Sequence, residues 1–356
     1  MLKPQAVVLG AGLMGRLLAC ALAQRGHQVE VYDAGSPDAE LAAARVAAAM
    51  LAPLAESAVT ELAVVRMGQY ALTRWPQLLA TMSQPVFFQQ SGTLVLWHRQ
   101  DTAEAERFAG QLARTSDALA TLPRAQRIDA NAIAALEPAL EHRFAQGLYL
   151  PDEGQLDNRA LLTGLAHQMQ VLGIKVHWHT PRTPDEVDPG PGAWLFDCRG
   201  LGAQPQWAAL RGVRGEVARI HAPAVTLSRP TRLVHPRYPL YIAPKPGGIF
   251  VIGATEIESD DLSPASVRST LELLSAAYTV HPGFGEARII ELGVQLRPTL
   301  PDNLPALRLP APRRMAINGL YRHGFMIAPA VLDAVLEIVD HDDSPLATAL
   351  GLPVIR

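Results

Sequence analysis

The chain has little cysteine and no apolar run long enough to cross a membrane. Its two cysteines, Cys20 and Cys198, match neither a disulfide framework nor a metal-ligand spacing, which indicates a reducing compartment. The longest apolar candidate, residues 46–55, is broken by Pro53 and falls short of the roughly 18 residues of a membrane span. We therefore predict a cytoplasmic protein without membrane association.

Lysine is also scarce, and charge of one sign is not in excess. Three lysines stand against 28 arginines, a bias that resembles codon usage more than selection for binding. The net charge of -3 excludes the basic footprint that nucleic acid or anionic lipid requires, so small molecules are the predicted partners. With 49% hydrophobic residues, the 356-residue chain suffices for two domains or for one discontinuous domain.

The first 33 residues predict a dinucleotide site. Residues 6–9 form a short apolar strand, and Gly10, Gly12 and Gly15 follow it as GxGxxG, the opening of a helix. The first glycine permits a tight turn, the second the close approach of a pyrophosphate, and the third close helix packing. Asp33 ends the next strand, 18 residues after Gly15, where it can accept hydrogen bonds from ribose hydroxyls.

Two other interpretations fit this segment less well. A secretory signal peptide would use Lys3 and the apolar residues behind it, but it needs neither spaced glycines nor a strand ending at Asp33. The second is a glycine-rich turn in an unrelated α/β protein. Such a turn would not require the complete order of strand, turn, helix and strand that residues 6–33 show.

Helical and extended patterns alternate along the rest of the chain. Helices are predicted over residues 38–50, 61–80, 102–122, 159–172 and 330–340, and strands over residues 147–150, 175–178 and 194–197. Residues 86–98 predict strands around a turn at Ser91 and Gly92, and residues 212–253 are dominated by short strands. No second GxGxxG is present, which predicts one dinucleotide rather than a flavin and a nicotinamide together.

Several further segments carry a family resemblance through their order and spacing. Besides GAGLMG and Asp33 they are AAAMLAPLAE (47–56), SGTLVL (91–96), LEPAL (136–140), YIAPKPGG followed by VIGATEIE, LRPTLPDNLP (296–305) and NGLYRHGFMIAPA (318–330). Together they resemble the flavoprotein amine oxidases, the family of D-amino-acid oxidase and sarcosine oxidase, and most closely its glycine oxidases of thiamine biosynthesis. The resemblance covers nearly the whole chain.

The resemblance implies an α/β fold in two parts. A Rossmann-type FAD-binding domain would comprise residues 1–82, 141–210 and 306–356, and a strand-rich α+β substrate domain would comprise residues 83–140 and 211–305. FAD would be noncovalent, because the covalent members place their cysteine in the C-terminal third, where this chain has none. The implied assembly is a homotetramer.

The implied reaction is oxidation of glycine or another small amino acid. Molecular oxygen becomes hydrogen peroxide, and the imine product serves thiazole formation in thiamine biosynthesis. Such hydride transfer asks mainly for positioning. A planar guanidinium can hold the substrate carboxylate with two parallel hydrogen bonds, and Arg297, at the end of ELGVQLRP, is the candidate.

The resemblance assigns further residues to the site. Tyr241 would add a hydrogen bond to the substrate carboxylate, Arg322 would contact substrate or cofactor, and Met50 would line the substrate side of the ring. The implied cofactor-binding residues are Gly10, Gly12, Leu13, Met14, Gly15, Asp33, Ala49, Met50, Leu51, Val176, Gly200, Arg322, His323, Gly324, Phe325 and Met326. His323 and Leu320 depart from the usual asparagine and histidine, which leaves the local hydrogen bonding and the substrate preference open.

No metal site is predicted. His177 and His179 would project from one strand face, but no third ligand is evident. Three alternatives to a glycine oxidase stay open from the sequence. They are a D-amino-acid oxidase or a dehydrogenase with another electron acceptor, a non-catalytic flavin-binding protein, and an NAD-dependent dehydrogenase that rests on GxGxxG alone.

Overall fold

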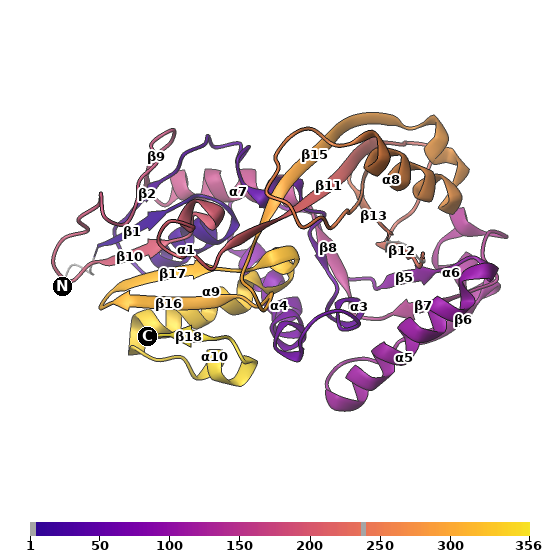
Figure 1. The fold of residues 1–356 in the computed structure, drawn as a ribbon, viewed down its shortest axis with the longest axis horizontal. Coiled ribbons are helices and arrows are strands. Elements are labelled where there is room, and N and C mark those ends of the chain that lie inside the picture. The colour runs from indigo at the N-terminus through magenta and orange to yellow at the C-terminus, as the bar shows by residue number, and fades with distance from the viewer. Residues whose placement is uncertain (1–4, 236–239) are drawn as a thin grey trace.

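The computed structural model describes residues 5–235 and 240–356, so that Lys3 of the signal-peptide alternative lies outside the described residues. The described residues form sheets of seven, eight and three strands, with helices on their faces. The seven-stranded and eight-stranded sheets lie at opposite ends of the view in Figure 1. Strands β11 (Arg211–His221) and β15 (Arg288–Thr299) run from the eight-stranded sheet toward the seven-stranded one (Figure 1).

The seven-stranded sheet is parallel around its centre. Its members are β1 (Ala6–Leu9), β2 (Val29–Tyr32), β9 (Lys175–His177), β10 (Trp194–Asp197), β16 (Ala306–Ala311), β17 (Arg314–Asn318) and β18 (Val354–Ile355). Strand β1 is buried on both faces, as its continuous apolar sequence requires, and pairs in parallel with β2 on one side and β10 on the other. The strand order thus reverses beside β1, which is where open α/β sheets bind ligands.

Four helices bury the apolar faces of this sheet. They are α1 (Leu13–Gln24), α4 (Leu62–Ala80), α7 (Asn158–Val171) and α9 (Gly324–His341). Pro329 inside α9 has no N–H to donate to the carbonyl of Phe325, and the Trp75 indole of α4 donates to that carbonyl at 2.8 Å instead. None of the helices in the described ranges combines the length and the apolar character needed to cross a bilayer.

The eight-stranded sheet contains both of the long strands. Its other members are β5 (Thr93–Leu96), β6 (Gln126–Asp129), β7 (Gln146–Leu150), β12 (Thr231–Leu233), β13 (Leu240–Lys245) and β14 (Ile249–Gly253). One face of β11, β13 and β14 packs its apolar side chains against α8 (Val267–Val280). The opposite face is therefore free to line a site.

A third, small sheet and several further helices complete the fold. The three-stranded sheet contains β3 (Met50–Leu51), β4 (Phe88–Gln89) and β8 (Gly154–Leu156). The other α-helices are α2 (Ala43–Val46), α3 (Pro53–Glu56), α5 (Thr102–Ala118), α6 (Ala130–Leu136) and α10 (Pro345–Leu350). Short 3-10 turns include η3 (Gly200–Ala203) and η5 (Tyr321–His323).

The predicted helix over residues 38–50 is wrong over most of its length. Only α2 is helical there, and the chain from Ala47 onward is extended or turned. The Asn158 amide binds the carbonyls of Ala44 and Arg45, and the Lys245 ammonium binds that of Ala48 at 2.8 Å. These long-range partners take the carbonyls that a helix would use internally, so tertiary contacts override the alanine propensity.

The strands expected on either side of Ser91 and Gly92 do not pair with each other. Strand β4 pairs with β8 in the three-stranded sheet, whereas β5 pairs with β7 and β12 in the eight-stranded sheet. The Gly92 N–H donates to the Glu153 carbonyl at 2.9 Å, which directs the chain from one sheet into the other. Alternation in a sequence predicts a strand but does not identify its partner.

The predicted domain boundaries stay a prediction, and the strands of the two large sheets follow them with one exception. Every strand of the seven-stranded sheet comes from residues 1–82, 141–210 or 306–356. Strand β7 also comes from the second of these ranges, yet it lies in the eight-stranded sheet because it pairs with β5 and β6.

Candidate functional site

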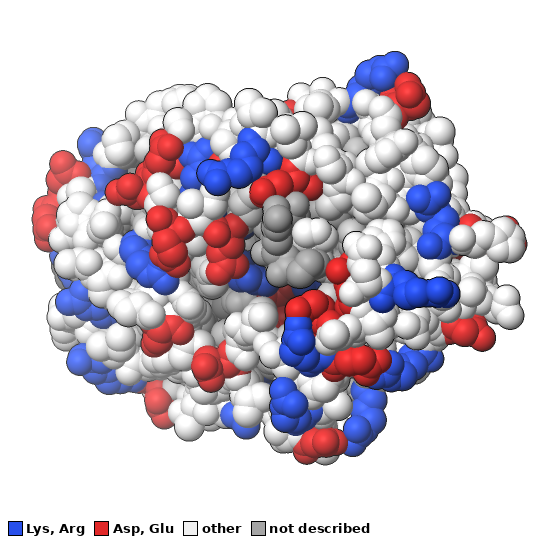
Figure 2. Space-filling view, turned by 45° about the vertical axis from the view of Figure 1, so that its right-hand side comes forward, with Lys and Arg blue, Asp and Glu red and all other residues white. Residues whose placement is uncertain are grey.

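A cavity of about 970 Å³ lies where the carboxyl ends of β1, β2 and β10 meet the free face of the eight-stranded sheet. This volume is at the upper end of the roughly 300–1,000 Å³ of small-molecule and cofactor sites. Most of the predicted site residues line it: Gly10, Gly12, Leu13, Met14, Asp33, Ala49, Met50, Gly200, Tyr241, Arg297, Arg322, His323, Gly324, Phe325 and Met326. Acidic and basic side chains are interspersed over the face of the molecule shown in Figure 2.

Three predicted residues do not line the cavity. Gly15 and Leu51 are buried in the core, and Val176 pairs with Val31 between β9 and β2. A Cβ atom on Gly15 would lie 1.8 Å from the Gly10 carbonyl oxygen, so this glycine permits close packing of the helix on the turn. Whether these three residues contact a cofactor stays a prediction.

The glycine turn fits a pyrophosphate. Gly10 has a φ of +91°, and a Cβ there would lie 2.7 Å from the Cys198 carbonyl oxygen, because β1 and β10 end side by side. A Cβ on Gly12 would meet no heavy atom nearer than the Ala42 Cβ at 3.9 Å, so the space before it is open. A group that approaches this backbone would meet the first N–H groups of α1, which favour phosphate.

Asp33 is fixed beside the same turn. Its two carboxylate oxygens accept hydrogen bonds from the backbone N–H groups of Ala11 and Gly35. Each oxygen keeps a further lone pair, so the side chain can still accept from two hydroxyl groups. This geometry suits a ribose.

Arg16 is a residue of this end that the sequence did not identify. It is fully buried in α1 and donates to the carbonyls of Ala11 at 2.6 Å, Leu162 at 2.7 Å and Pro37 at 2.9 Å. Burial lowers the pKa of Arg16 to about 10, so the group stays charged at neutral pH. The side chain ties the glycine turn to the segment that follows Asp33. Its position directly after the glycine motif was visible, but the distant acceptors Pro37 and Leu162 were not.

At the other end of the cavity, Arg297 and Tyr241 face the same space. They come from β15 and β13, and the intervening strands carry Gly215 and Gly253. A Cβ on Gly215 would lie 2.4 Å from Arg297 Nη2, and one on Gly253 would lie 2.7 Å from Tyr241 Oη. The two glycines thus make room for the guanidinium and the phenol on the sheet. Neither glycine carries a signal in the sequence that identifies this role.

Met50 approaches the same face from β3. It packs on the apolar cluster of Ala48, Val217 and Val251, which Tyr241 also joins. Burial raises the pKa of Tyr241 and lowers that of Arg297. The phenol is therefore neutral at physiological pH and can donate its proton in a hydrogen bond.

Glu56, at the end of α3, is a second residue that the sequence did not single out. Its carboxylate lies 2.6 Å from Arg232 Nη2 and 2.8 Å from Arg322 Nη2, and it lines the cavity. Burial would raise its pKa, but the charges of Arg322 and Arg232 outweigh burial and hold the pKa far below the ordinary value. The segment AAAMLAPLAE contained Glu56, yet nothing in the sequence connected it with Arg232.

Arg322 is held at both ends of its fork. Nη2 binds Glu56, and Nη1 lies 2.7 Å from Glu256, which also accepts a hydrogen bond from Tyr321. Burial lowers the pKa of His323 to about 4, so the imidazole is neutral at physiological pH. By contrast, no carboxylate in the described part of the chain lies within 4.0 Å of the Arg297 guanidinium.

Helix α9 begins at this end of the cavity. Its first residues, Gly324, Phe325 and Met326, line the cavity, so the helix N-terminus faces the space. The helix starts earlier than the predicted range of 330–340, and Pro329 lies in its second turn. The positive end of its dipole favours negative charge on any group bound there.

The two histidines near β9 are not arranged as a ligand pair. His177 stacks on Tyr32 at 4.4 Å and lies 2.6 Å from Glu30, whereas His179 follows the strand at a φ of +53°. Residues 5–235 and 240–356 contain no group of three or more His, Cys, Asp or Glu side chains that could hold a metal ion.

The buried Glu153 carboxyl group, which accepts a hydrogen bond from the Ala55 N–H, should make the stability of the folded protein depend on pH. Burial raises the pKa of Glu153 from 4.5 to about 7. The folded state thus binds the proton more tightly than the unfolded state, and the resulting stability is full below pH 4.5 and lost as the pH rises through 7. Between these pH values, we expect the free energy of unfolding of the wild type to fall by an amount on the order of 3 kcal/mol. This decrease should be absent in the E153Q variant, which has no carboxyl group to titrate. Thermal unfolding of both proteins over this pH range, with FAD in excess, measures the difference. An equal dependence of stability on pH in the two proteins would contradict the role of Glu153.

Comparison with known proteins agrees with this geometry. The family model for FAD dependent oxidoreductases matches residues 5–335. An oxidoreductase assigned to thiamine biosynthesis in Rhizobium etli, ThiO, is 40% identical over 330 residues, which cover 92% of this chain and 94% of that protein.

Solved structures share the fold at lower identity. Iminodiacetate oxidase from Chelativorans sp. BNC1 has a TM-score of 0.81 at 20% identity, covering 99% of this chain and 100% of that chain. Glycine oxidase from Geobacillus kaustophilus has a TM-score of 0.79 at 22% identity, covering 96% and 95% of the two chains. They confirm the predicted α/β fold with a Rossmann-type domain and a second, strand-rich part. The chain belongs to the FAD dependent oxidoreductase family, and its cofactor is FAD.

Proposed function

We propose that this protein oxidises glycine and other small amino acids to the imine, with reduction of oxygen to hydrogen peroxide, and that the imine serves thiazole formation in thiamine biosynthesis. The single observation that carries the proposal is the Arg297 guanidinium, which faces the cavity beside Tyr241 and has no carboxylate within 4.0 Å among the residues that the structure describes. The 40% identical relative of Rhizobium etli supports the assignment to thiamine biosynthesis.

The residues present fit FAD along the whole cavity. The turn at Gly10 and Gly12 would hold the pyrophosphate, and Asp33 would hold a ribose. Ala49, Met50 and the start of α9 would border the ring. When bound, FAD supplies the acceptor for two electrons that leave the substrate Cα as a hydride and pass on to oxygen.

Arg297 and Tyr241 would bind the substrate carboxylate. The guanidinium donates two parallel hydrogen bonds, which fix the orientation as well as the position of the carboxylate. The neutral phenol adds a third hydrogen bond. Held in this way, the substrate would have its Cα oriented for hydride transfer, and the chain would contribute to the rate by positioning.

Within residues 5–235 and 240–356, no charged base that lines the cavity beside Arg297 and Tyr241 is free to act. His323 is neutral and buried, and Glu56 is held by two arginines. The amine therefore has to lose its extra proton to solvent before hydride transfer. Water afterwards converts the glycine imine to glyoxylate and ammonia, which balances the reaction.

The charges at this end of the cavity favour monocarboxylic substrates. Arg232 and Arg322 are balanced by Glu56 and Glu256, so Arg297 leaves one positive charge for one carboxylate. Among the described residues that line this end of the cavity, a second substrate carboxylate would lie near Glu56 and Glu256 and would meet no unpaired cation. We expect iminodiacetate to be a much poorer substrate than glycine or sarcosine.

Peroxide release by the purified yellow protein in air tests the proposal. Glycine, sarcosine, D-alanine, D-proline and iminodiacetate are compared at equal concentration. Glycine at least as good as the D-amino acids supports a glycine oxidase, and a strong preference for D-amino acids supports the D-amino-acid oxidase alternative. Peroxide from none of them, with FAD bound, refutes the oxidase and favours a dehydrogenase with another acceptor.

Assembly and location belong to the same proposal. We propose a cytoplasmic homotetramer: free Cys20 and Cys198 support a reducing compartment, and the family resemblance implies the tetramer. Light scattering of the purified holoprotein measures the mass directly, and a monomer would contradict the assembly.

A further inference from the structure

The feature that carries a further inference is a buried ion pair on the back of the substrate-binding sheet. Arg214 and Glu216 lie on β11 and are 4% and 2% exposed. Side chains alternate along a strand, so these two point away from the face on which Gly215 makes room for Arg297. Neither residue belongs to the motifs that predicted the site.

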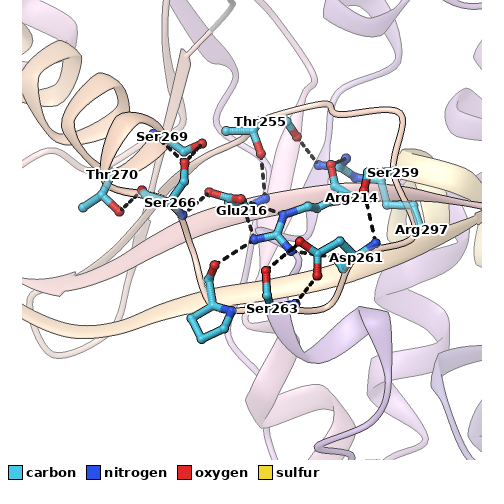
Figure 3. A network of polar contacts seen from close by, with 11 residues as sticks. Arg214, Glu216, Thr255, Ser259, Asp261, Ser263, Ser266, Ser269, Thr270 and Arg297 are labelled. Carbon is cyan, nitrogen blue, oxygen red and sulfur yellow. Dashed lines mark hydrogen bonds and ion pairs between the residues drawn. The ribbon is translucent and has the colours of Figure 1, made fainter.

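The side chains of the pair hold the segment that follows β14. The Arg214 guanidinium lies 2.7 Å from Glu216 and donates to the carbonyls of Asp261 at 2.5 Å and Pro264 at 3.0 Å. Glu216 also accepts from the Ser266 N–H at 3.3 Å. Figure 3 shows the pair at the centre of this network, with Asp261 and Ser266 around it and Arg297 nearby.

The backbone of the same two residues holds the start of that segment. Arg214 and Ile257 exchange two backbone hydrogen bonds, of 2.9 and 3.0 Å. The Glu216 N–H donates to the Thr255 hydroxyl at 2.9 Å, and its carbonyl accepts from the Thr255 N–H at 3.2 Å. Residues 255–266 are thus attached to β11 both through backbone groups and through the side chains of Arg214 and Glu216.

Arg297 is oriented by carbonyl groups of this assembly. Its Nη2 donates to the Thr255 carbonyl at 2.9 Å and its Nη1 to the Arg214 carbonyl at 3.3 Å (Figure 3). A guanidinium has five N–H donors in a rigid plane, so two bonds on one side fix the direction in which the others point. Any shift of Thr255 or Arg214 would therefore rotate the donors offered to a substrate carboxylate.

We propose that Arg214 and Glu216 are a positioning pair for the carboxylate grip of Arg297, an inference that rests on the proposed function of that arginine. Neither residue of the pair lines the cavity. The pair fixes residues 255–266 and with them the Thr255 carbonyl that accepts from Arg297 Nη2, while the Arg214 carbonyl that accepts from Nη1 lies on β11 itself. Its contribution is thus to substrate binding rather than to retention of FAD.

The test compares the R214M holoenzyme with wild type. Methionine keeps much of the apolar stem and removes every donor. We expect the KM for glycine to rise about tenfold or more while kcat changes less than about threefold. The reason is that the substrate carboxylate loses a correctly oriented guanidinium, whereas FAD, which accepts the electrons, stays bound. Acetate, a carboxylate without an amine, reports on the grip alone, and its Kd from the flavin spectrum should rise by the same factor.

A matched control separates this role from general destabilisation. R229M breaks another largely buried ion pair, Arg229 with Glu137 at 3.0 Å, whose residues do not line the cavity. We expect R229M to lower Tm while leaving KM and acetate binding as in wild type. The conservative R214K variant keeps one charge but cannot serve Glu216 and both carbonyls together, so only partial recovery of acetate binding is expected.

The outcomes discriminate between the two proposals. If R214M lowers Tm as R229M does, with unchanged KM and acetate Kd, the positioning role is refuted. If the wild type oxidises no amine, the proposed function fails, and the acetate titration still decides whether the pair orients Arg297. If R214M does not fold, E216Q, which removes one charge with little change of shape, is measured by the same readouts.

Discussion

Replacing Arg297 by alanine is expected to reduce kcat/KM for glycine by about a hundred- to a thousandfold, because the substrate carboxylate loses a buried, charge-assisted partner. FAD should stay bound, since Arg297 is on β15 and belongs neither to the glycine turn nor to Asp33, which would hold the pyrophosphate and the ribose. The measurement is steady-state peroxide release together with the FAD content of the purified variant.

R297K is the matched variant for this prediction. Lysine keeps the positive charge but cannot offer two parallel donors in a plane. We expect its kcat/KM to fall between those of wild type and R297A, with a rise in KM as the main effect. Unchanged turnover in R297A would remove Arg297 from the site.

The E56Q variant is expected to lose about 3–5 kcal/mol of unfolding free energy, the usual effect of removing one partner from a buried ion pair. Glutamine keeps the shape of the side chain but leaves Arg232 and Arg322 without their shared anion. Because the folded pKa of Glu56 is depressed, its stabilisation is present above the ordinary pKa of a glutamate and is lost as the pH falls through the depressed value. The deficit of E56Q should therefore be constant around neutral pH and shrink only in strong acid.

Denaturant unfolding of the FAD-loaded proteins at several pH values measures this loss. The control is E106Q, which removes a carboxylate from an exposed pair with Arg127 and should change stability little. Equal midpoints for E56Q and E106Q would show that the Glu56 cluster contributes no net stability.

The dinucleotide end could be predicted from the sequence because its determinants are local. Gly10, Gly12 and Asp33 lie within one strand, turn, helix and strand unit, and each has a separate physical reason to be there. Arg16 lies inside the same unit but could not be predicted, because its acceptors include Leu162 and Pro37, outside the motif.

The substrate end could be predicted only in part. The segments around Tyr241 and Arg297 pointed to these residues, but their common orientation depends on the order of four strands and on Gly215 and Gly253 between them. Glu56 lay in a recognised segment, whereas its partner Arg232 is 176 positions away. Long-range pairs of this kind leave no periodic signal in a sequence.

Reduction of the flavin by glycine without oxygen tests the central claim most directly. Glycine is added anaerobically to the purified yellow protein, and the visible absorbance of oxidised FAD is followed before and after air is admitted. The account predicts loss of the absorbance with glycine, its return in air, and hydrogen peroxide in an amount equal to the glyoxylate formed. Absorbance that persists with glycine and with every other small amino acid would contradict the account.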